Sequence, residues 1–310
     1  MITTLKKDFL SILDFSPDEL NACLTLAKSM KTARALRQNG HQPLAGLHVA
    51  LLFEKPSLRT RATLQIAIRE LGGETIEPPP DVALGGRENP CDVARNLERW
   101  VAAAVIRTFA QARLQEFAAA APSLHVVNAL TDEEHPCQAL ADVMTLEEHL
   151  GSLRDRTIAF VGDGNNVATS LAHAGVMCGA RVRVASPRGF ELPAKVRQEC
   201  ERVAAAGGSV EVTNDPHAAV ADAHAVYTDV WTSMGQEAEA DARRKVFGAF
   251  QVNAELMAYA RPGALVMHCL PAHRGEEITD EVIDSASSVV FDQAENRLHT
   301  QKALLAMLVR

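Results

Sequence analysis

Short runs of apolar and β-branched residues alternate with longer segments of helical periodicity along most of the chain. In the first half we expect strands at 47–53, 74–77, 102–106 and 125–128; in the second half we expect them at 157–161, 181–185, 209–213, 225–228, 265–268 and 289–291. Apolar runs of this length that alternate with helices are typical of parallel sheets covered by helices. The pattern predicts an α/β fold with two doubly wound parallel-sheet domains.

The segment "HPCQALADVMTLEEHLG" separates the two halves. Its proline suits a first helical turn and its glycine suits a helix end, which predicts a helix from about Pro136 to Leu150. We expect this helix to lead from a first domain, residues 1–135, into a second domain, residues 136–310. A C-terminal helix at about 293–310, with leucines at helical spacing, should pack back on the first domain. The domains would then be joined by interdomain helices.

Composition narrows the set of partners. The chain of 310 residues has 31 Lys and Arg against 39 Asp and Glu, a formal charge of −8, and no long basic run. We therefore expect neither a nucleic-acid nor a membrane partner, and any anion must be bound by a local cluster of cations. The six cysteines lack the paired spacing of a zinc site or a disulfide framework, and no secretory or membrane-spanning segment is recognisable. A cytoplasmic protein is the expectation.

The stretch "FEKPSLRTRATL" joins an expected strand to an expected helix. Ser57 is a good N-cap, and the start of the helix offers N–H donors and a positive dipole end, which together favour a phosphate. Arg59 and Arg61 are two residues apart and point to nearly opposite sides of the helix. We assign Arg59 to an anion and Arg61 to a structural ion pair. Taken alone, the stretch fits a capped helix with exposed arginines equally well.

A second motif, "HPCQ", marks the start of the interdomain helix. His135 precedes a proline, which biases its backbone away from helix and places it at the N-cap. Gln138 then falls at the third helical position, where it could fold back onto the cap as in a capping box. Alternatively, both side chains aim donors at a ligand. The motif alone favours the structural interpretation.

Two further motifs follow expected strands directly. In "DVWTSMG", Asp229 comes after strand 225–228, at a carboxyl end, where open α/β sheets bind their ligands. Its carboxylate could hold a cationic amine or simply cap the next helix. In "HCLPAHRGEE", Cys269 follows strand 265–268 in the same way. A lone buried cysteine is usually a small hydrophobic residue, but its position and neighbouring histidines make a functional role equally plausible.

The stretch "FVGDGNNVATSLAH" resembles a dinucleotide-binding fingerprint. However, Val167 stands at the third glycine position, and Ser186 stands where the acidic ribose ligand would follow the next strand. These departures argue against an NAD-dependent dehydrogenase. Asn165 and Asn166, at this helix start, could instead hold a substrate carboxylate.

In this order and at these separations, the four motifs resemble those of the ornithine carbamoyltransferases over nearly the whole chain. "SLRTR" is similar to the family's carbamoyl-phosphate motif, "HPCQALAD" to its second signature, "DVWTSMG" to its ornithine loop, and "HCLPAHRGEE" through "FDQAENRLHTQKALL" to its C-terminal block. The resemblance implies that the first domain binds carbamoyl phosphate and the second binds L-ornithine. It further implies formation of L-citrulline and phosphate in arginine biosynthesis, no metal or cofactor, and a homotrimer or a multiple of trimers.

The resemblance also implies a role for each matching residue. The phosphate would be held by Ser57, Leu58, Arg59, Thr60 and Arg107. The carbamoyl group would be addressed by His135, Gln138 and Arg297. Ornithine would be bound by Asn166, Asp229, Ser233 and Met234, with Cys269 and the backbone of Leu270 beside the reacting amine. The residues implied in the catalytic steps are Arg59, Arg107, His135, Asp229, Cys269 and Arg297.

Two positions depart from the family pattern. Leu58 replaces the usual threonine, although its backbone N–H is retained. Ala83 stands where the family commonly has a glutamine that contributes to the phosphate site, so that contact is missing unless a neighbour such as Arg87 replaces it. These departures leave a non-catalytic homologue open as an alternative. Within the enzyme class, a carbamoyltransferase for another amine acceptor, such as an acylornithine, putrescine or aspartate, is also possible.

Overall fold

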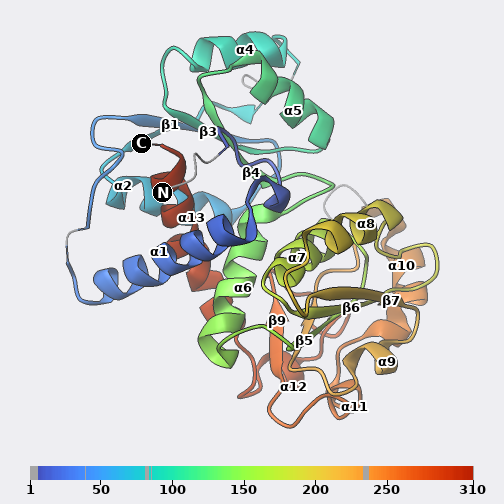
Figure 1. The fold of residues 1–310 in the computed structure, drawn as a ribbon. Helices are drawn as coiled ribbons and strands as arrows, with labels where there is room; N and C mark the ends of the chain where they lie inside the picture. The colour runs from blue at the N-terminus through green and yellow to red at the C-terminus, as the bar shows by residue number, and fades with distance from the viewer. Residues whose placement is uncertain (1–5, 39, 81–83, 85, 233–236, 310) are drawn as a thin grey trace. The chain divides into compact units, whose positions relative to one another are not determined.

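The computed structural model describes residues 6–38, 40–80, 84, 86–232 and 237–309. The chain forms two compact units, of which the first comprises Met1–Ala141 and Asn296–Arg310 and the second comprises Asp142–Glu295 (Figure 1). Helices α6 (Pro136–Leu150) and α13 (Val290–Leu308) each contain a point at which the chain passes from one unit to the other. The predicted interdomain helices are therefore confirmed, and α6 has the predicted bounds.

Within its described residues, the first unit contains one four-stranded sheet in the order β2-β1-β3-β4, and its strand pairs are all parallel. The strands are β1 (His48–Phe53), β2 (Glu74–Ile76), β3 (Ala103–Arg107) and β4 (His125–Leu130). The principal helices are α1 (Pro17–Ala35), α2 (Leu58–Glu70), α4 (Pro90–Leu97) and α5 (Gln111–Ala120). Figure 1 shows α4 and α5 on one side of this sheet, where Leu97 and Phe117 pack on Leu52 and Ile106.

Local sequence explains where α2 begins and ends. The Ser57 side chain accepts a hydrogen bond from the Thr60 backbone N–H at 3.3 Å, so Ser57 is the N-cap, as predicted. Leu64 and Ile68 are buried on one face of the helix. Gly72 follows the last turn with φ +86°, a conformation that favours glycine. These features place the N–H groups of the first turn just after the short loop, residues 54–57, that follows β1.

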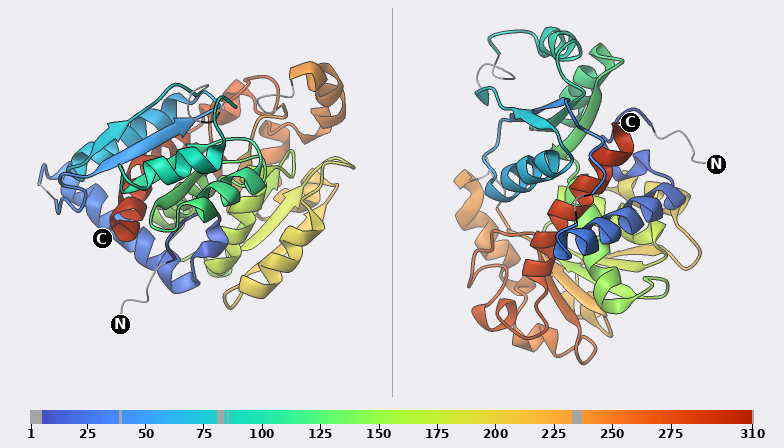
Figure 2. Two further views of the ribbon diagram at one scale, coloured as in Figure 1. Left: turned by 90° about the horizontal axis from the view of Figure 1, so that it is seen from above. Right: turned by 90° about the vertical axis from the view of Figure 1, so that its left-hand side faces the viewer.

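The second unit contains, in its described part, a five-stranded parallel sheet in the order β7-β6-β5-β8-β9. The strands are β5 (Thr157–Val161), β6 (Arg181–Ala185), β7 (Ser209–Thr213), β8 (Ala225–Thr228) and β9 (Leu265–His268), all with the predicted bounds. The helices include α7 (Asn166–Met177), α8 (Ala194–Val203), α9 (Pro216–Val220), α10 (Ala240–Phe247), α11 (Ala254–Met257) and α12 (Asp280–Ile283). Figure 2 gives two further views of this arrangement.

The strand order of the second sheet locates its ligand-binding edge. From β5 the chain adds β6 and β7 on one side and β8 and β9 on the other, which makes the gap between β5 and β8 a topological switch point. Ligands of open α/β sheets bind at such a point, outside the carboxyl ends of the strands. The segments that follow β5, β8 and β9 contain Asn165, Asp229 and Cys269, respectively.

One predicted strand is wrong. Residues 289–291 do not form a strand; Ser288 makes only an isolated bridge to Val266, and α13 begins at Val290, earlier than expected. The exposed Phe291 follows two buried valines, and burial returns at Gln293, a spacing that suits one face of a helix.

Among the described residues, no helix combines the length and apolar character needed to cross a membrane.

Candidate active site

In the first unit, Arg297 brings together two motifs that are far apart in sequence. Its Nη2 donates to Thr60 Oγ1 at 2.8 Å, and its Nη1 donates to Gln138 Oε1 at 2.5 Å. All three side chains are almost fully buried. Arg297, on α13, therefore ties the first turn of α2 to the first turn of α6, and three residues expected from sequence meet at one place.

The contact with Arg297 shows where the side-chain oxygen of Gln138 in "HPCQ" is directed. The backbone N–H of Gln138 donates to the His135 carbonyl at 3.0 Å, as a helix start requires. The side-chain oxygen of Gln138, however, is turned to Arg297. Gln138 is therefore part of the buried group around Arg297 as well as of the first turn of α6.

His135 lies in a buried, cationic environment. Burial lowers the pKa of its imidazole well below the usual value of 6.5, and the charges of Arg297 and Arg107 lower it further. Arg107 is the last residue of β3 and is itself buried. His135 is therefore a neutral imidazole at neutral pH, able to donate one hydrogen bond without adding charge.

The low pKa of His135 predicts a pH effect on stability. The unfolded chain takes up a proton on this ring near pH 6.5, whereas the folded protein does so only at lower pH. The contribution of His135 is therefore complete above about pH 6.5 and is lost as the pH falls below it. We expect His135→Asn to reduce the loss of unfolding free energy between pH 7.5 and 5.5, measured by urea denaturation. Replacing the exposed His41 with Asn is the control; an unchanged slope in His135→Asn would contradict the assignment.

The two arginines of "SLRTR" differ in environment, as predicted. Arg61 Nε lies 2.6 Å from Glu77 Oε1, and its guanidinium stands over the Phe53 ring, which confirms the structural ion pair. Arg59 is half-buried on a different side of α2. The Leu58 side chain is 80% exposed. Within this unit, any contribution of Leu58 to an anion site therefore comes from its backbone N–H.

Lys55 is a buried cation that sequence reasoning passed over. Its Nζ lies 2.5 Å from Asp132 Oδ1 and 4.3 Å from the centre of the Phe109 ring. Its place inside the quoted motif, just before Pro56 and the cap Ser57, was a usable signal. Lys55 adds a further positive charge to the loop that precedes α2.

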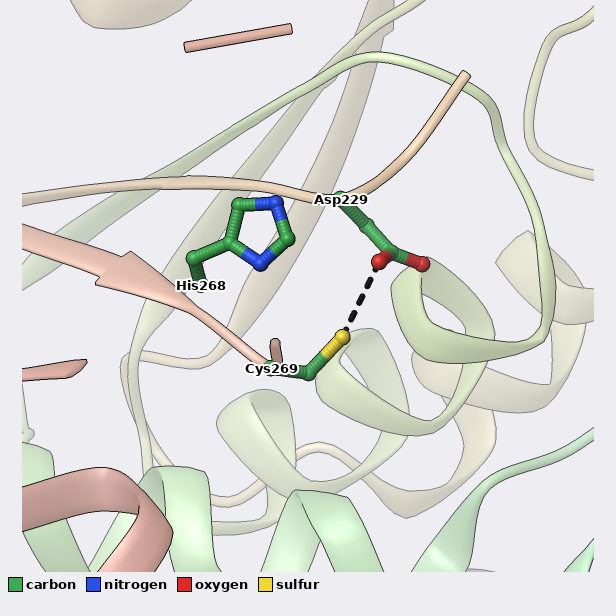
Figure 3. Close-up of side chains that lie close together, drawn as sticks. All are labelled: Asp229, His268 and Cys269. Carbon is green, nitrogen blue, oxygen red and sulfur yellow. Dashed lines mark hydrogen bonds between the residues drawn. The ribbon is translucent and has the colours of Figure 1, made fainter. Parts of the chain in front are cut away.

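In the second unit, Asp229 and Cys269 meet at the carboxyl ends of β8 and β9. Figure 3 shows the Cys269 thiol directed at Asp229, and its Sγ donates to Oδ1 at 3.0 Å. The other carboxylate oxygen accepts from Asn165 Nδ2 at 2.9 Å. Asp229 is 7% exposed. Two residues predicted from separate motifs thus form one hydrogen-bonded group.

Asn165, considered with Asn166 as a possible ligand of a substrate carboxylate, is a hydrogen-bond partner of Asp229. Its Oδ1 caps α7 by accepting from the Val167 and Ala168 backbone N–H groups at 2.9 and 3.1 Å. The same side chain reaches Asp229 through Nδ2. Asn166, the first residue of α7, is partly buried beside it. The cap therefore couples the start of α7 to the carboxylate after β8.

A buried arginine that the sequence did not single out supports these loops. Arg243 Nη1, on α10, lies 2.6 Å from Asp163 Oδ2 and donates to the Trp231 carbonyl at 2.8 Å. Burial raises the pKa of Asp163, the hydrogen bond and charge of Arg243 oppose that shift, and the charge of Asp229 adds to it. Arg243 thus joins the segment after β5 to the segment after β8.

Removal of Arg243 should cost stability. Arg243→Ala leaves a largely buried Asp163 without its cation, and breaking such a buried pair costs about 3–5 kcal/mol. The neighbouring Arg244 pairs with Asp241 and Glu276 at the surface, so Arg244→Ala should cost about 0–1 kcal/mol. Urea denaturation of both variants tests this difference. Equal losses of unfolding free energy in the two variants would show that the buried pair stabilises the protein no more than the surface pairs do.

Three side chains of this region carry atoms that can bind a metal ion: Asp229, His268 and Cys269. Among the described residues, the donor atoms of these three lie within 4.8 Å of one another. However, His268 Nδ1 accepts the Leu270 backbone N–H at 2.9 Å, and Nε2 lies 3.1 Å from Glu277 Oε1. Both ring nitrogens are thus engaged in hydrogen bonds, so the group is better described as a hydrogen-bonded cluster than as a metal centre.

Some expected site residues cannot be placed. Ser233 and Met234 of the expected ornithine loop lie outside the described residues, as does Ala83. Arg87, considered as a replacement for the missing glutamine, is described and is exposed. Leu270 is half-buried, with φ +57°.

Comparisons with known proteins find relatives over the whole chain. Residues 7–148 match the family model for the aspartate/ornithine carbamoyltransferase carbamoyl-P binding domain, and residues 154–308 match the one for the Asp/Orn binding domain. An ornithine carbamoyltransferase of Pyrococcus abyssi is 48% identical over 312 residues, which span 100% of this chain and 98% of the relative. One of Symbiobacterium thermophilum is 49% identical over 311 residues, spanning 99% and 100%.

Solved structures agree as well. The chain is similar to the ornithine carbamoyltransferase structure from Pyrococcus furiosus, with a TM-score of 0.94, 45% identity, and coverage of 100% of this chain and 99% of that one. The structure from Thermus thermophilus gives a TM-score of 0.89 and 44% identity, with coverage of 99% and 100%. The similarity extends over both units.

Proposed function

Because the chain belongs to the aspartate/ornithine carbamoyltransferase family, we propose that it transfers the carbamoyl group of carbamoyl phosphate to the δ-amine of L-ornithine. The products are L-citrulline and phosphate, as arginine biosynthesis requires. The observation that carries this proposal is the buried cationic cluster of Arg107 and Arg297 around a neutral His135. Such a cluster suits a doubly negative donor with a carbonyl group.

The first unit is the carbamoyl-phosphate-binding part of the molecule. Arg59, Arg107 and the N–H groups at the start of α2 neutralise the phosphate and the charge that grows on its bridging oxygen. His135, Gln138 and Arg297 donate to the carbonyl oxygen as the tetrahedral species forms. Preorganised donors of this kind contribute about 2.7–4 kcal/mol each to transition-state stabilisation where they have been measured.

The second unit binds the acceptor. Asp229 orients ornithine by its α-amino group, Asn166 holds its α-carboxylate, and Cys269 and the Leu270 backbone lie beside the δ-amine. The uncharged amine attacks the carbamoyl carbon, the bond from that carbon to the phosphate oxygen breaks, and the amine proton passes to the departing phosphate. The step needs no oxidant or reductant, since phosphate is already a leaving group.

Ornithine is favoured over other acceptors by two observations. The carboxylate of Asp229 at the switch point suits an amino acid's α-amino group, which putrescine and acylornithines do not offer in free form. The two relatives of 48% and 49% identity are named ornithine carbamoyltransferases. The cysteine pattern favours the cytoplasm as the compartment.

A homotrimer, or a multiple of trimers, is the proposed assembly. The large side chains exposed on α2 and β2 of the first unit, Leu58, Ile66 and Ile76, support a contact surface there. Light scattering of the purified protein gives the molar mass in solution. A monomer would rule out this assembly.

The decisive experiment supplies the purified protein with carbamoyl phosphate and a panel of amines. L-Ornithine should give citrulline, while N-acetylornithine, putrescine and L-aspartate should give little or no carbamoylated product. Faster reaction of another amine would change the substrate assignment. Binding of carbamoyl phosphate without any product would identify a non-catalytic homologue.

A further inference from the structure

The proposed function leaves two fully buried side chains unexplained. His268, the last residue of β9, and Glu277 are both 0% exposed. Figure 3 shows the His268 ring close to Cys269 and Asp229. Neither residue has an assigned role in binding or transfer, yet both lie at the base of the loop that carries Cys269.

Hydrogen bonds define the state of the His268 ring. Its Nδ1 accepts from the Leu270 backbone N–H at 2.9 Å, so the lone pair of Nδ1 is in use and the ring proton is on Nε2. Nε2 then donates to Glu277 Oε1 at 3.1 Å. This imidazole therefore connects a buried carboxylate to the backbone of the Cys269 loop.

The same carboxylate holds the other end of the loop. Glu277 Oε1 accepts from the His273 backbone N–H at 2.6 Å. At the near end, the His268 backbone N–H donates to Gln293 Oε1 at 3.1 Å, and Gln293 Nε2 donates to the buried Asp142 at 2.7 Å. Residues 268–273 are thus fixed at both ends by buried polar groups.

Burying Glu277 is costly if its only task is to close a loop. The described partners of its carboxylate include a ring that is neutral in this arrangement and a backbone N–H, and taking a carboxylate out of water costs several kcal/mol. A well-packed apolar side chain would often be as stable or more so. A carboxyl group at this buried position points to a task that packing does not perform.

That task is to orient the peptide between Cys269 and Leu270. In a trans peptide the C=O and N–H groups point in opposite directions, so the Leu270 N–H bond to His268 turns the Cys269 carbonyl away from the ring. Leu270 has φ +57°, an uncommon conformation for a residue with a side chain, which its surroundings must hold in place. The fixed peptide leaves the Cys269 thiol directed at Asp229.

We propose that Glu277 and His268 are positioning residues that set the Cys269–Leu270 peptide for the amine acceptor. Glu277 keeps the ring proton on Nε2, Nδ1 holds the Leu270 N–H, and the peptide in turn places the thiol against Asp229. The inference rests on the proposed function, in which Cys269 and Leu270 lie beside the δ-amine of ornithine.

Two substitutions of the same residue separate positioning from stability. The oxygen of Asn in His268→Asn can take the place of Nδ1 and accept the Leu270 N–H, but it does not reach Glu277. The amide nitrogen of Gln in His268→Gln can take the place of Nε2 and donate to Glu277, but it supplies no acceptor at Nδ1. His268→Asn should therefore be the less stable of the two, and His268→Gln the poorer catalyst.

Steady-state kinetics and thermal unfolding test whether the less stable variant and the less active variant are different ones. We expect His268→Gln to lower kcat/KM for ornithine by about 10²-fold relative to His268→Asn, as a small misplacement of reacting groups does. The Kd for carbamoyl phosphate should be the same in both variants, and the Tm should be lower in His268→Asn. If activity and Tm fall together in the same variant, the role is structural and the proposal fails.

A second readout does not depend on catalysis. Iodoacetamide labelling of Cys269, located by peptide mass spectrometry, should be faster in His268→Gln than in His268→Asn because the thiol loses its fixed contact with Asp229. Absence of citrulline from the unaltered protein would reject the proposed function, but the labelling order would still test the positioning pair. Equal labelling rates and equal kcat/KM in His268→Gln and His268→Asn would overturn the proposal.

The tautomer of His268 can be tested in the unaltered protein, so this test does not depend on the folding of the variants. Nitrogen-15 NMR of histidine-labelled protein distinguishes the two neutral tautomers. The His268 ring should carry its proton on Nε2. A proton on Nδ1 would exclude the Leu270 hydrogen bond and with it the proposal.

Discussion

Arg59→Ala should reduce kcat/KM for carbamoyl phosphate by about 10²–10³-fold, the loss seen when a single preorganised donor to a developing charge is removed. Arg59 is half-buried in the first turn of α2, whose N–H groups and dipole already favour an anion. A lysine in its place would retain charge but lose the planar fork that binds two phosphate oxygens together. We expect Arg59→Lys to recover only part of the activity.

Arg61→Ala is the matched control for this experiment. Arg61 is two residues away on the same helix and carries the same charge, but it pairs with Glu77 at the surface. Its loss should cost about 0–1 kcal/mol of stability and leave carbamoyl phosphate kinetics nearly unchanged. Initial rates at varied carbamoyl phosphate, with urea denaturation of both variants, decide the matter. An exchange of the two phenotypes would show that the wrong face of α2 has been assigned to the anion.

The fold was largely predictable because the strands have an unambiguous pattern. A buried parallel strand such as β5 is an apolar run bounded by polar turns, so its limits can be taken from sequence alone. The run at 289–291 failed because a short apolar segment fits a strand or one turn of a helix equally well. In the structure, the helical backbone hydrogen bond from Gln293 N–H to the Val289 carbonyl and the burial of Val290 and Gln293 distinguish the two.

The site was predictable only as far as its motifs extend. Strand ends located Asp229 and Cys269, and parallel order in one sheet brought them together. Pairings that depend on tertiary packing left no local signal. Arg243 pairs with Asp163, 80 residues away in sequence, and Glu277 contacts Nε2 of the His268 ring at the base of the Cys269 loop. Asn165 and Asn166 are adjacent and alike, so sequence could not tell which one reaches Asp229.

Asp229→Asn should affect the kinetics of the acceptor and not the binding of carbamoyl phosphate. The substitution keeps the size of the side chain and an oxygen that can still accept from the Cys269 thiol, although the hydrogen bond from Asn165 is lost. It also removes the negative charge that, in the proposed function, holds the α-amino group of ornithine. Loss of one partner from a buried, hydrogen-bonded charge pair costs about 2 kcal/mol or more. That corresponds to a decrease in kcat/KM for ornithine of roughly 30-fold or more, with the Kd for carbamoyl phosphate unchanged.

Asp163→Asn provides the comparison, because both carboxylates lie in the loops at the switch point and the charge of Asp229 raises the pKa of Asp163. Asp163 is held by Arg243, so its loss should weaken the folded state more than the binding of ornithine. Kinetics at varied ornithine and urea denaturation of both variants should therefore give opposite patterns. An Asp229→Asn protein with unchanged KM and kcat for ornithine would remove this carboxylate from the acceptor site. The α-amino group would then have to be held by another residue of the second unit.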